Sequence, residues 1–174
     1  MGKCFLGQLS QLAQRLSQAS SPIYLSLILL ASSKKVLTSP NYHHLGLSSC
    51  VDDLQASDAP PMSPAEIVEF LSRAPEQAIL VDNTSSQDVA DAYPLFLAKG
   101  ISVVTPNKKA FSGDLKLWNG IFGAAANGTT GSGGYVFHEA SVGAGLPVIS
   151  TLKELVETGD EVVKVEGVFS GTMS

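Results

Sequence analysis

The sequence predicts an α/β fold, with helices on both faces of a parallel sheet. Three observations lead to this class. Amphipathic segments with helical spacing alternate along the chain with short apolar segments. Those apolar segments are hydrophobic at nearly every position, which is typical of strands buried on both faces. Polar loops follow the later strands, at the carboxyl ends where such sheets bind their ligands.

The composition is that of a globular chain with few charges. Its 174 residues are 44% hydrophobic and 16% charged, which excludes a disordered chain. The formal net charge is −5 and no basic block is present, so nucleic acid and membranes are not expected partners. Its 2 cysteines are too few for a disulfide framework and favour a reducing, cytoplasmic location.

The first part of the chain predicts a helix followed by a buried strand. Apolar residues recur at helical spacing over residues 3–19, and Ser20-Ser21-Pro22 ends the helix. Residues 23–31 are then the most apolar window, far shorter than the roughly 20 residues that span a bilayer. A secretory signal is the less favoured alternative, because a helix precedes the window. Residues 32–61 predict the least regular structure.

The middle of the chain continues the alternation of helices and strands. Ser63 precedes Pro64, and Glu66 lies in the first turn, which predicts a capped helix through about Ala74. Strands are expected at 78–81 and 101–105, with a helix at 87–99 that Gly100 ends. Further helices are expected at 114–122 and 146–157, a flexible glycine-rich connector at 123–134, and strands at 135–138 and 162–169.

Several stretches together resemble one enzyme family. They are residues 81–86 (VDNTSS), 105–111 (TPNKKAF), 138–150 (HEASVGAGLPVIS) and 158–172 (TGDEVVKVEGVFSGT). In this order and spacing they resemble the homoserine dehydrogenases of fungi. The resemblance covers nearly the whole chain and is weakest over residues 32–61. It implies an NAD(P)H-dependent reduction of aspartate 4-semialdehyde to homoserine, in threonine, isoleucine and methionine biosynthesis, by a homodimeric enzyme.

The resemblance also implies a domain organisation. Residues 1–122 correspond to a Rossmann-like NAD(P)-binding domain without its first strand, 123–134 to the connector, and 135–174 to the start of the catalytic and dimerisation domain. The family's catalytic lysine and substrate-binding acids come after Ser174. The chain alone is therefore expected to be inactive, and the alternative is a non-catalytic nucleotide-binding or regulatory remnant.

Cofactor-binding positions follow from the same correspondence. The family's last nucleotide-loop glycine matches Gly2, and its lysine beside the nicotinamide and substrate matches Lys108. Taken alone, Lys108 reads as a solvated surface charge, and residues 83–86 read as a cap for the next helix. The other positions matched to the cofactor are Asn83, Thr84, Ser85, Gly171 and Thr172.

A monovalent cation site, expected to hold sodium, is implied as well. It matches Glu139, Val142, Ala144 and Leu146, where one carboxylate and backbone carbonyls offer the oxygen ligands of a hard cation. The alternative from spacing alone is a glycine-rich turn with an exposed Glu139. His138 is expected to be a core or loop histidine, since no nucleophile accompanies it.

Two further expectations concern the cofactor and a rival enzyme. Lys34 and Lys35 follow the expected 23–31 strand, where an acid would bind the ribose of NAD, and they favour NADP. A dehydrogenase acting on the semialdehyde itself would need a nucleophilic cysteine. Cys50 lies in no such context.

Overall fold

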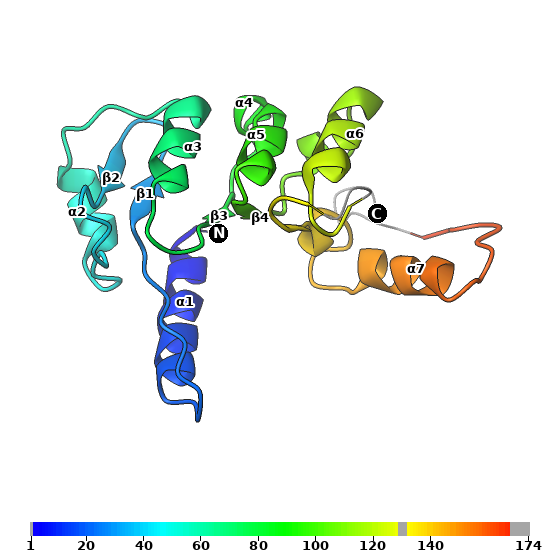
Figure 1. The fold of residues 1–174 in the computed structure, drawn as a ribbon, viewed down its shortest axis with the longest axis horizontal. Coiled ribbons are helices and arrows are strands. Elements are labelled where there is room, and N and C mark those ends of the chain that lie inside the picture. The colour runs from blue at the N-terminus through cyan, green and yellow to red at the C-terminus, as the bar shows by residue number, and fades with distance from the viewer. Residues whose placement is uncertain (1, 129–131, 168–174) are drawn as a thin grey trace. The chain divides into compact units, whose positions relative to one another are not determined.

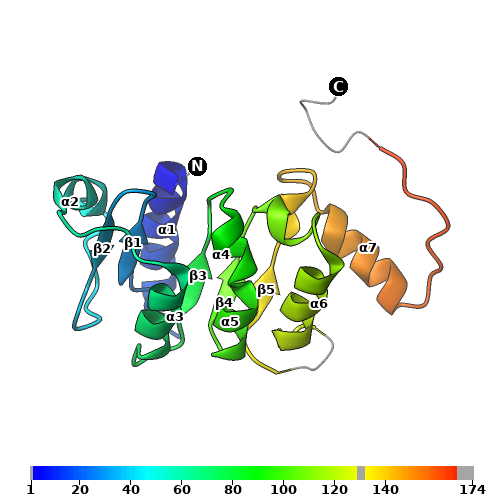
Figure 2. The ribbon, with the colours of Figure 1, turned by 90° about the horizontal axis from the view of Figure 1, so that it is seen from above.

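The structure is a computed structural model that describes residues 2–128 and 132–167. It divides into two compact units, Met1–Pro75 and Glu76–Ser174. Figure 1 shows the order of the elements, and Figure 2 shows the same ribbon from above. No described helix is long and apolar enough to cross a membrane.

In its described residues, the unit Met1–Pro75 contains three helices and a two-stranded antiparallel sheet. The expected first helix is confirmed as α1 (Gly2–Ser17). Strands β1 (Leu29–Ala31) and β2 (Val36–Thr38) form a hairpin in which Leu30 pairs with Leu37. Between them, the Ser32 hydroxyl accepts hydrogen bonds from the amides of Lys34 and Lys35.

The expected buried strand over residues 23–31 is largely wrong. Only its last three residues, Leu29–Ala31, form β1. Ile23 is 54% exposed and Tyr24 is 78% exposed, although both belong to the most apolar window of the chain. An apolar segment favours burial, but only other parts of the folded chain can provide the surface that buries it.

Residues 32–61 are more regular than expected. They contain β2 and the helix α2 (Cys50–Ala56), which packs against the hairpin and buries Cys50 completely. The Ser57 hydroxyl donates to the carbonyl of Val36 at 2.8 Å, which ties the end of α2 to β2. These contacts join residues about twenty positions apart, so the local polar composition gave no sign of them.

The capped helix α3 (Pro64–Ser72) is confirmed in detail. Ser63 and Glu66 form the expected capping box, with the Glu66 carboxylate accepting from the Ser63 amide at 2.7 Å. The Ser63 hydroxyl, followed by its amide, lowers the pKa of Glu66 through these hydrogen bonds. The boundary at Pro64 follows because a first-turn proline has no amide hydrogen to lose.

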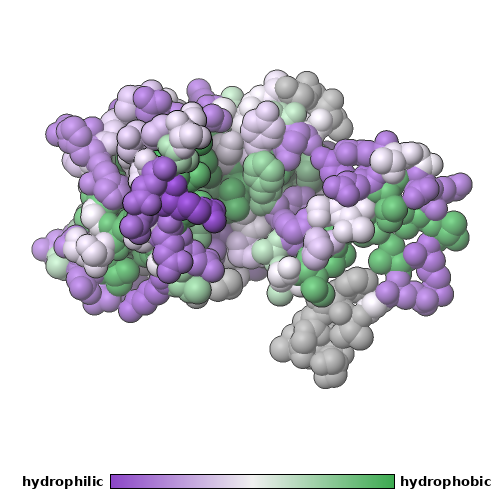
Figure 3. Space-filling view, turned by 90° about the horizontal axis from the view of Figure 1, so that it is seen from below, coloured by the Kyte–Doolittle hydropathy of each residue, from purple (hydrophilic) through white to green (hydrophobic). Residues whose placement is uncertain are grey.

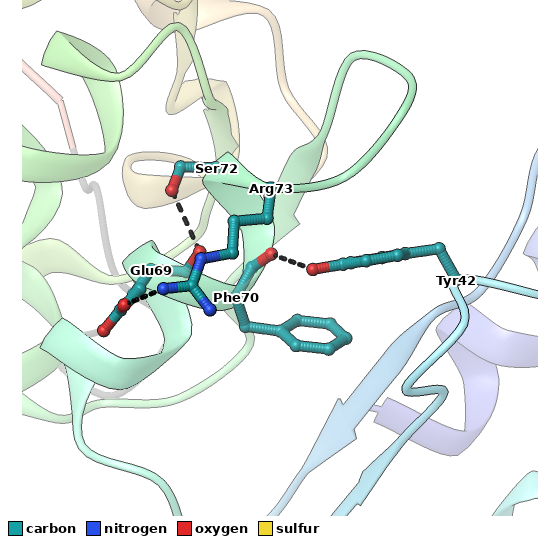
Figure 4. A network of polar contacts seen from close by, with 5 residues as sticks. All are labelled: Tyr42, Glu69, Phe70, Ser72 and Arg73. Atoms are coloured by element: carbon teal, nitrogen blue, oxygen red, sulfur yellow. Dashed lines mark hydrogen bonds and ion pairs between the residues drawn. The ribbon is translucent and has the colours of Figure 1, made fainter.

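The far end of α3 is tied to the segment that follows β2, as Figure 4 shows. The Tyr42 hydroxyl donates to the carbonyl of Phe70 at 2.9 Å, and the two rings lie 4.9 Å apart. The Arg73 guanidinium pairs with Glu69 on the same helix, where both side chains are mostly exposed. An exposed pair of this kind adds little stability, so the Tyr42 contact is the one that matters for packing.

The unit Glu76–Ser174 is built on a parallel sheet in the order β3-β4-β5. The strands are β3 (Ile79–Val81), β4 (Ser102–Val104) and β5 (Val136–Phe137), so the strands predicted at 78–81, 101–105 and 135–138 are confirmed in shortened form. Helices α4 (Gln87–Asp91), α5 (Tyr93–Ala98) and α6 (Leu115–Ala124) lie on one side of it (Figure 1). The expected helix 87–99 is divided at Ala92, ahead of Pro94.

The core of this unit lies between the sheet and those helices. Val103 and Leu97 are completely buried, and Ile121 of α6 closes the same layer. Side chains on the other sheet face are more open: Val104 is 38% exposed and Phe137 is 55% exposed. In both β4 and β5 the last residue is the exposed one, whereas Ser102 and Val103 of β4 and Val136 of β5 are buried.

The described parts of the glycine-rich segment 123–134, which is expected to be a flexible connector, form backbone hydrogen bonds with the rest of the unit. The Gly134 amide donates to the carbonyl of Leu97 at 2.8 Å, and its own carbonyl accepts from the amide of Ala126 at 2.8 Å. A Cβ at Gly134 would lie 2.3 Å from the carbonyl oxygen of Ile101. Glycine is needed here for close backbone approach, and not for flexibility.

Residues 142–167 contain one helix and no strand. The expected helix is confirmed as α7 (Val148–Glu157), and Gly159 with φ of +99° follows its end. The expected strand at 162–169 is wrong for residues 162–167, where no partner strand is present in the described chain, and its last two residues lie outside the described residues. No residue of α7 is buried.

Candidate cofactor site

Two polar loops leave the sheet of the second unit at the same edge. Residues 82–86 follow β3 and residues 105–109 follow β4, and the two strands are parallel neighbours. The carboxyl ends of parallel strands meet at one edge, which is where open α/β sheets bind ligands. This edge is the candidate cofactor site.

A buried carboxylate lies at the base of the first loop. Asp82 is only 3% exposed, and in the described part of the chain it forms no ion pair. Its Oδ1 accepts from the amide of Thr84 at 2.7 Å. Its Oδ2 accepts from the Tyr93 hydroxyl at 2.5 Å and from Asn107 Nδ2 at 3.2 Å. Neutral donors therefore satisfy this carboxylate, as burial requires.

Thr105 and Asn107 extend the same network into the second loop. The Thr105 hydroxyl donates to the carbonyl of Asp82 at 2.9 Å and accepts from the amide of Asn107 at 2.9 Å. Asn107 Nδ2 also donates to the carbonyl of Ser86 at 2.9 Å. The side chain of Asn107 thus joins both loops, and its Oδ1 accepts from the amide of Lys109 at 3.2 Å.

Tyr93 enters this network from the first residue of α5. It is completely buried, and its hydroxyl lies 2.9 Å from Thr105 Oγ1 as well as against Asp82. Burial, followed by the hydrogen bond to Asp82, raises the pKa of Tyr93 far above its ordinary value. The phenol therefore remains a neutral donor at physiological pH.

The predicted cofactor-binding residues of the first loop lie on the surface above this network. Thr84 and Ser85 are exposed and Asn83 is half-buried. The Thr84 hydroxyl accepts from the amide of Ser86 at 3.1 Å, and the Ser86 hydroxyl caps α4 through the amide of Val89. The capping role expected for this loop is thus confirmed at Ser86, and it leaves Thr84 and Ser85 facing solvent.

Lys108 begins the short 3-10 turn η1 (Lys108–Ala110) in the second loop. Both Lys108 and Lys109 are exposed, as the sequence indicates for lysines taken alone. Asn107 caps this turn. Lys108 therefore projects from a turn whose start is held by a buried side chain.

An aromatic cluster packs behind η1. The ring of Phe111 stacks on His138 with centroids 4.1 Å apart, and Phe122 meets the edge of the same imidazole at 5.6 Å. Burial lowers the pKa of His138, and Lys153 adds to this effect while Glu139 opposes it. His138 is therefore a neutral packing residue, in keeping with the expectation for it.

The four residues matched to a cation site lie in one turn between β5 and α7. Glu139 is not simply exposed: its carboxylate accepts from the amides of Ile149 and Ser150, each at 2.9 Å, in the first turn of α7. The carbonyl of Leu146 accepts from the amide of Val148 at 2.9 Å. Ala144 has a left-handed φ of +52°, and Val142 follows the 3-10 turn η2 (Glu139–Ser141).

This donor set fits a hard monovalent cation. Each carboxylate oxygen of Glu139 has a lone pair beyond the one that its amide partner uses, and a carbonyl oxygen likewise has two. Oxygen ligands from one carboxylate and from carbonyls are the kind that such a cation prefers. Among the described residues, no group of three or more His, Cys, Asp or Glu side chains could hold a metal.

The remaining predicted residues belong to the other unit or lie outside the described residues. Gly2 is the first residue of α1, in the unit Met1–Pro75, and it is exposed. Gly171 and Thr172 lie outside the described residues. Neither Tyr93 nor Asn107 is predicted as a site residue from the sequence. Both are distant from Asp82 along the chain, and no local motif links them to it.

Known proteins match the part of the chain that forms this edge of the sheet. A family model described as the NAD-binding domain of homoserine dehydrogenase matches residues 5–131, which include both loops. The chain belongs to the homoserine dehydrogenase family. The predicted Rossmann-like α/β class is confirmed with it, since the family's solved structures share this fold.

Individual relatives agree with the family model. The homoserine dehydrogenase of Emericella nidulans is 49% identical over 100% of this chain, which covers 45% of that relative. A crystal structure of a Candida auris protein of unknown function is 42% identical, with a TM-score of 0.76 over 94% of this chain and 44% of that one. A hyperthermophilic archaeal homoserine dehydrogenase in complex with NADPH shares the fold at 23% identity and a TM-score of 0.57, over 83% of this chain and 43% of that one.

The match in length is unequal. The chain spans less than half of the curated homoserine dehydrogenases that it matches over its whole length, at 45% and 46%. The matched family region ends at residue 131, before β5 and the turn that holds Glu139. The family model therefore covers the NAD-binding part, whereas the curated relatives match the chain over its whole length.

Proposed function

We propose that this chain is the NAD(P)-binding part of a homoserine dehydrogenase, which reduces aspartate 4-semialdehyde to homoserine. The observation that carries the proposal is the polar edge of the sheet, where exposed Thr84, Ser85 and Lys108 project from loops joined through Asp82. Family membership supplies the reaction class. The domain boundaries are also proposed: residues 1–122 form the NAD(P)-binding domain, 123–134 the connector, and 135–174 the start of the catalytic and dimerisation domain.

The first loop has the groups that a nicotinamide dinucleotide needs. Hydroxyls of Thr84 and Ser85 and the amide of Asn83 can bond ribose and phosphate oxygens. The amide end of α1 at Gly2 suits a pyrophosphate, because unpaired amides and the helix dipole attract anions. Gly171 and Thr172 complete the proposed cofactor contacts.

Lys108 is proposed to act beside the nicotinamide and the substrate. The bound dihydronicotinamide supplies the hydride that adds to the aldehyde carbon. As the carbon accepts it, negative charge develops on the aldehyde oxygen, and the ammonium of Lys108 stabilises that charge. A proton must then reach the oxygen to complete the alcohol. The main catalytic lysine and substrate acids are proposed to lie outside this chain.

NADP is the proposed form of the cofactor. Lys34 lies exposed in the turn between β1 and β2, where a 2′-phosphate would bind, whereas Lys35 Nζ donates to the carbonyl of Gln55 at 2.5 Å. Lys34 is therefore the residue to test. A sodium ion at Glu139, Val142, Ala144 and Leu146, homodimerisation and a cytoplasmic location in threonine, isoleucine and methionine biosynthesis complete the proposal.

The test is a fluorescence titration of the purified chain with NADPH, beside an assay of semialdehyde-dependent NADPH oxidation. Binding without turnover is the expected result. Turnover would contradict the placement of the catalytic lysine outside this chain. No binding by a chain that circular dichroism shows to be folded would refute the cofactor role and favour the non-catalytic remnant.

A further inference from the structure

Asp82 has no part in the proposed reaction, although it lies directly beneath the loop that carries Thr84 and Ser85. It is almost fully buried, and the side-chain groups that reach its carboxylate come from α5 and from the loop after β4. A buried carboxylate without a cationic partner costs free energy unless every lone pair that faces the protein is used. A buried carboxylate at this position therefore calls for a structural explanation.

The two carboxylate oxygens of Asp82 accept hydrogen bonds from different loops, so this side chain joins the two loops. Oδ1 holds the amide of Thr84, while Oδ2 holds Asn107, whose other amide bond reaches the carbonyl of Ser86 in the first loop. Asn107 Oδ1 in turn holds the amide of Lys109, beside Lys108. Neither loop can move far without breaking a bond that the other loop depends on.

Tyr93 stabilises the centre of this arrangement. Its hydroxyl contacts both Asp82 and Thr105, and its ring packs in the core from the start of α5. Bonds to a carboxylate are stronger than bonds between neutral groups, and low local polarity strengthens them further. The helix layer is thus connected to both loops through one phenol.

We propose that Asp82, Tyr93 and Asn107 are positioning residues that hold loop 83–85 and Lys108 as a single body. These three residues set the distance between two parts of the site. One part is the loop that binds the cofactor's ribose and phosphate, and the other is the lysine beside its nicotinamide. None of the three touches the ligand in this proposal, which rests on the proposed cofactor role. Its mechanical part, the coupling of the two loops, is testable without any cofactor.

The first experiment measures amide hydrogen exchange on the full chain by NMR, with Tyr93→Phe as the variant. The readouts are the amides of Thr84 and Lys109, one in each loop, neither of which bonds Tyr93 itself. We expect both to lose protection by about tenfold relative to the core amide of Val103. Unchanged protection, or a loss confined to one loop, would overturn the coupling.

A matched control separates positioning from general destabilisation. Phe96→Leu alters another buried aromatic residue of α5, which has no polar atom to contribute to the network. It should lower protection evenly, with no selective loss at Thr84 and Lys109. If Tyr93→Phe does not fold, Thr105→Val serves instead, because it removes a network hydroxyl at nearly constant volume.

The second experiment is a titration of the same proteins with NADPH. The Kd of the Tyr93→Phe variant should rise about tenfold, while Phe96→Leu stays within about twofold of wild type. Equal affinities in the two folded variants would overturn the positioning role. Failure of the wild-type chain to bind would refute the proposed cofactor role alone, and the exchange data would then decide the coupling.

Discussion

At the carboxyl edge of the sheet several polar side chains are buried, whereas in the segment from α7 onward several apolar side chains are exposed. At the edge, the polar side chains of Asp82, Thr105 and Asn107 are 2–3% exposed and fully hydrogen-bonded. In the other segment, Leu155 is 39% exposed and Val163 is 92% exposed. Figure 3 shows apolar patches next to hydrophilic ones on the side where α7 lies, and further apolar patches elsewhere on the same face.

The difference shows that burial is decided by available partners as much as by polarity. Asp82 is buried because donors on α5 and on the neighbouring loop reach it within hydrogen-bond distance. No residue of α7 is buried against the rest of the described chain, so its apolar side chains remain open. Perturbing each region should therefore have very different consequences.

The largest effect is expected from Asp82→Ala. It removes the acceptor of the Thr84 amide and one of the two acceptors of both the Tyr93 hydroxyl and Asn107 Nδ2, which keep Thr105 Oγ1 and the Ser86 carbonyl. Because these bonds to a buried carboxylate are lost together, the free energy of unfolding should fall by about 3–5 kcal/mol. Urea denaturation followed by circular dichroism measures it. The control is Asp88→Ala at an exposed position; comparable losses in the two variants would contradict the importance of the network.

A pair of leucine truncations compares the two regions directly. Leu97→Ala empties a completely buried site and should cost about 3 kcal/mol of unfolding free energy. Leu155→Ala, on the open helix α7, should change it by less than about 0.5 kcal/mol. A large loss at Leu155 in denaturant titrations would show that α7 is covered in solution.

A smaller and local effect is expected at the start of α7. Glu139→Gln removes the charge and one of the two acceptors that hold the amides of Ile149 and Ser150, which should cost about 1 kcal/mol. Amide exchange in the first turn of α7 is the measurement. Glu154→Gln on the same helix is the matched control and should leave that turn unchanged.

The smallest effect is a pH dependence at His138. Its pKa is lowered in the folded chain, so the unfolded state binds the proton first as the pH falls below the ordinary value of about 6.5. This contribution to stability is present at pH 7 and is lost as the pH falls toward the lowered folded pKa. Wild type should therefore lose more stability than His138→Phe between about pH 7 and pH 5 in thermal melts. Parallel curves would contradict the assignment.

Local signals in the sequence predicted the elements they govern. The start of α3 could be predicted because its signals lie within one helical turn: the capping box of Ser63 and Glu66, and the proline between them. The same holds for Gly159 after α7 and for the apolar strand before Asp82. By contrast, residues 23–31 looked like a long buried strand because hydrophobicity records a tendency and not a neighbour.

The site divides in the same way. Motifs around Thr84 and Lys108 identified the two loops, and the structure brings both to one edge of the sheet. The resemblance placed Glu139 at a cation site, but only the folded chain shows that its carboxylate caps α7. Whether a cation binds there as well stays a prediction.

By itself, the sequence determined the α/β class, the capped start of α3 and the family, because periodicity, caps and motifs are properties of nearby residues. The tertiary structure alone decided that Asp82 is buried, that Tyr93 and Asn107 satisfy it, and that the glycine at 134 admits a passing backbone. Asp82 and Asn107 are 25 residues apart in the sequence. Contacts over such separations depend on which strands pair and in what register, and local composition does not encode that choice.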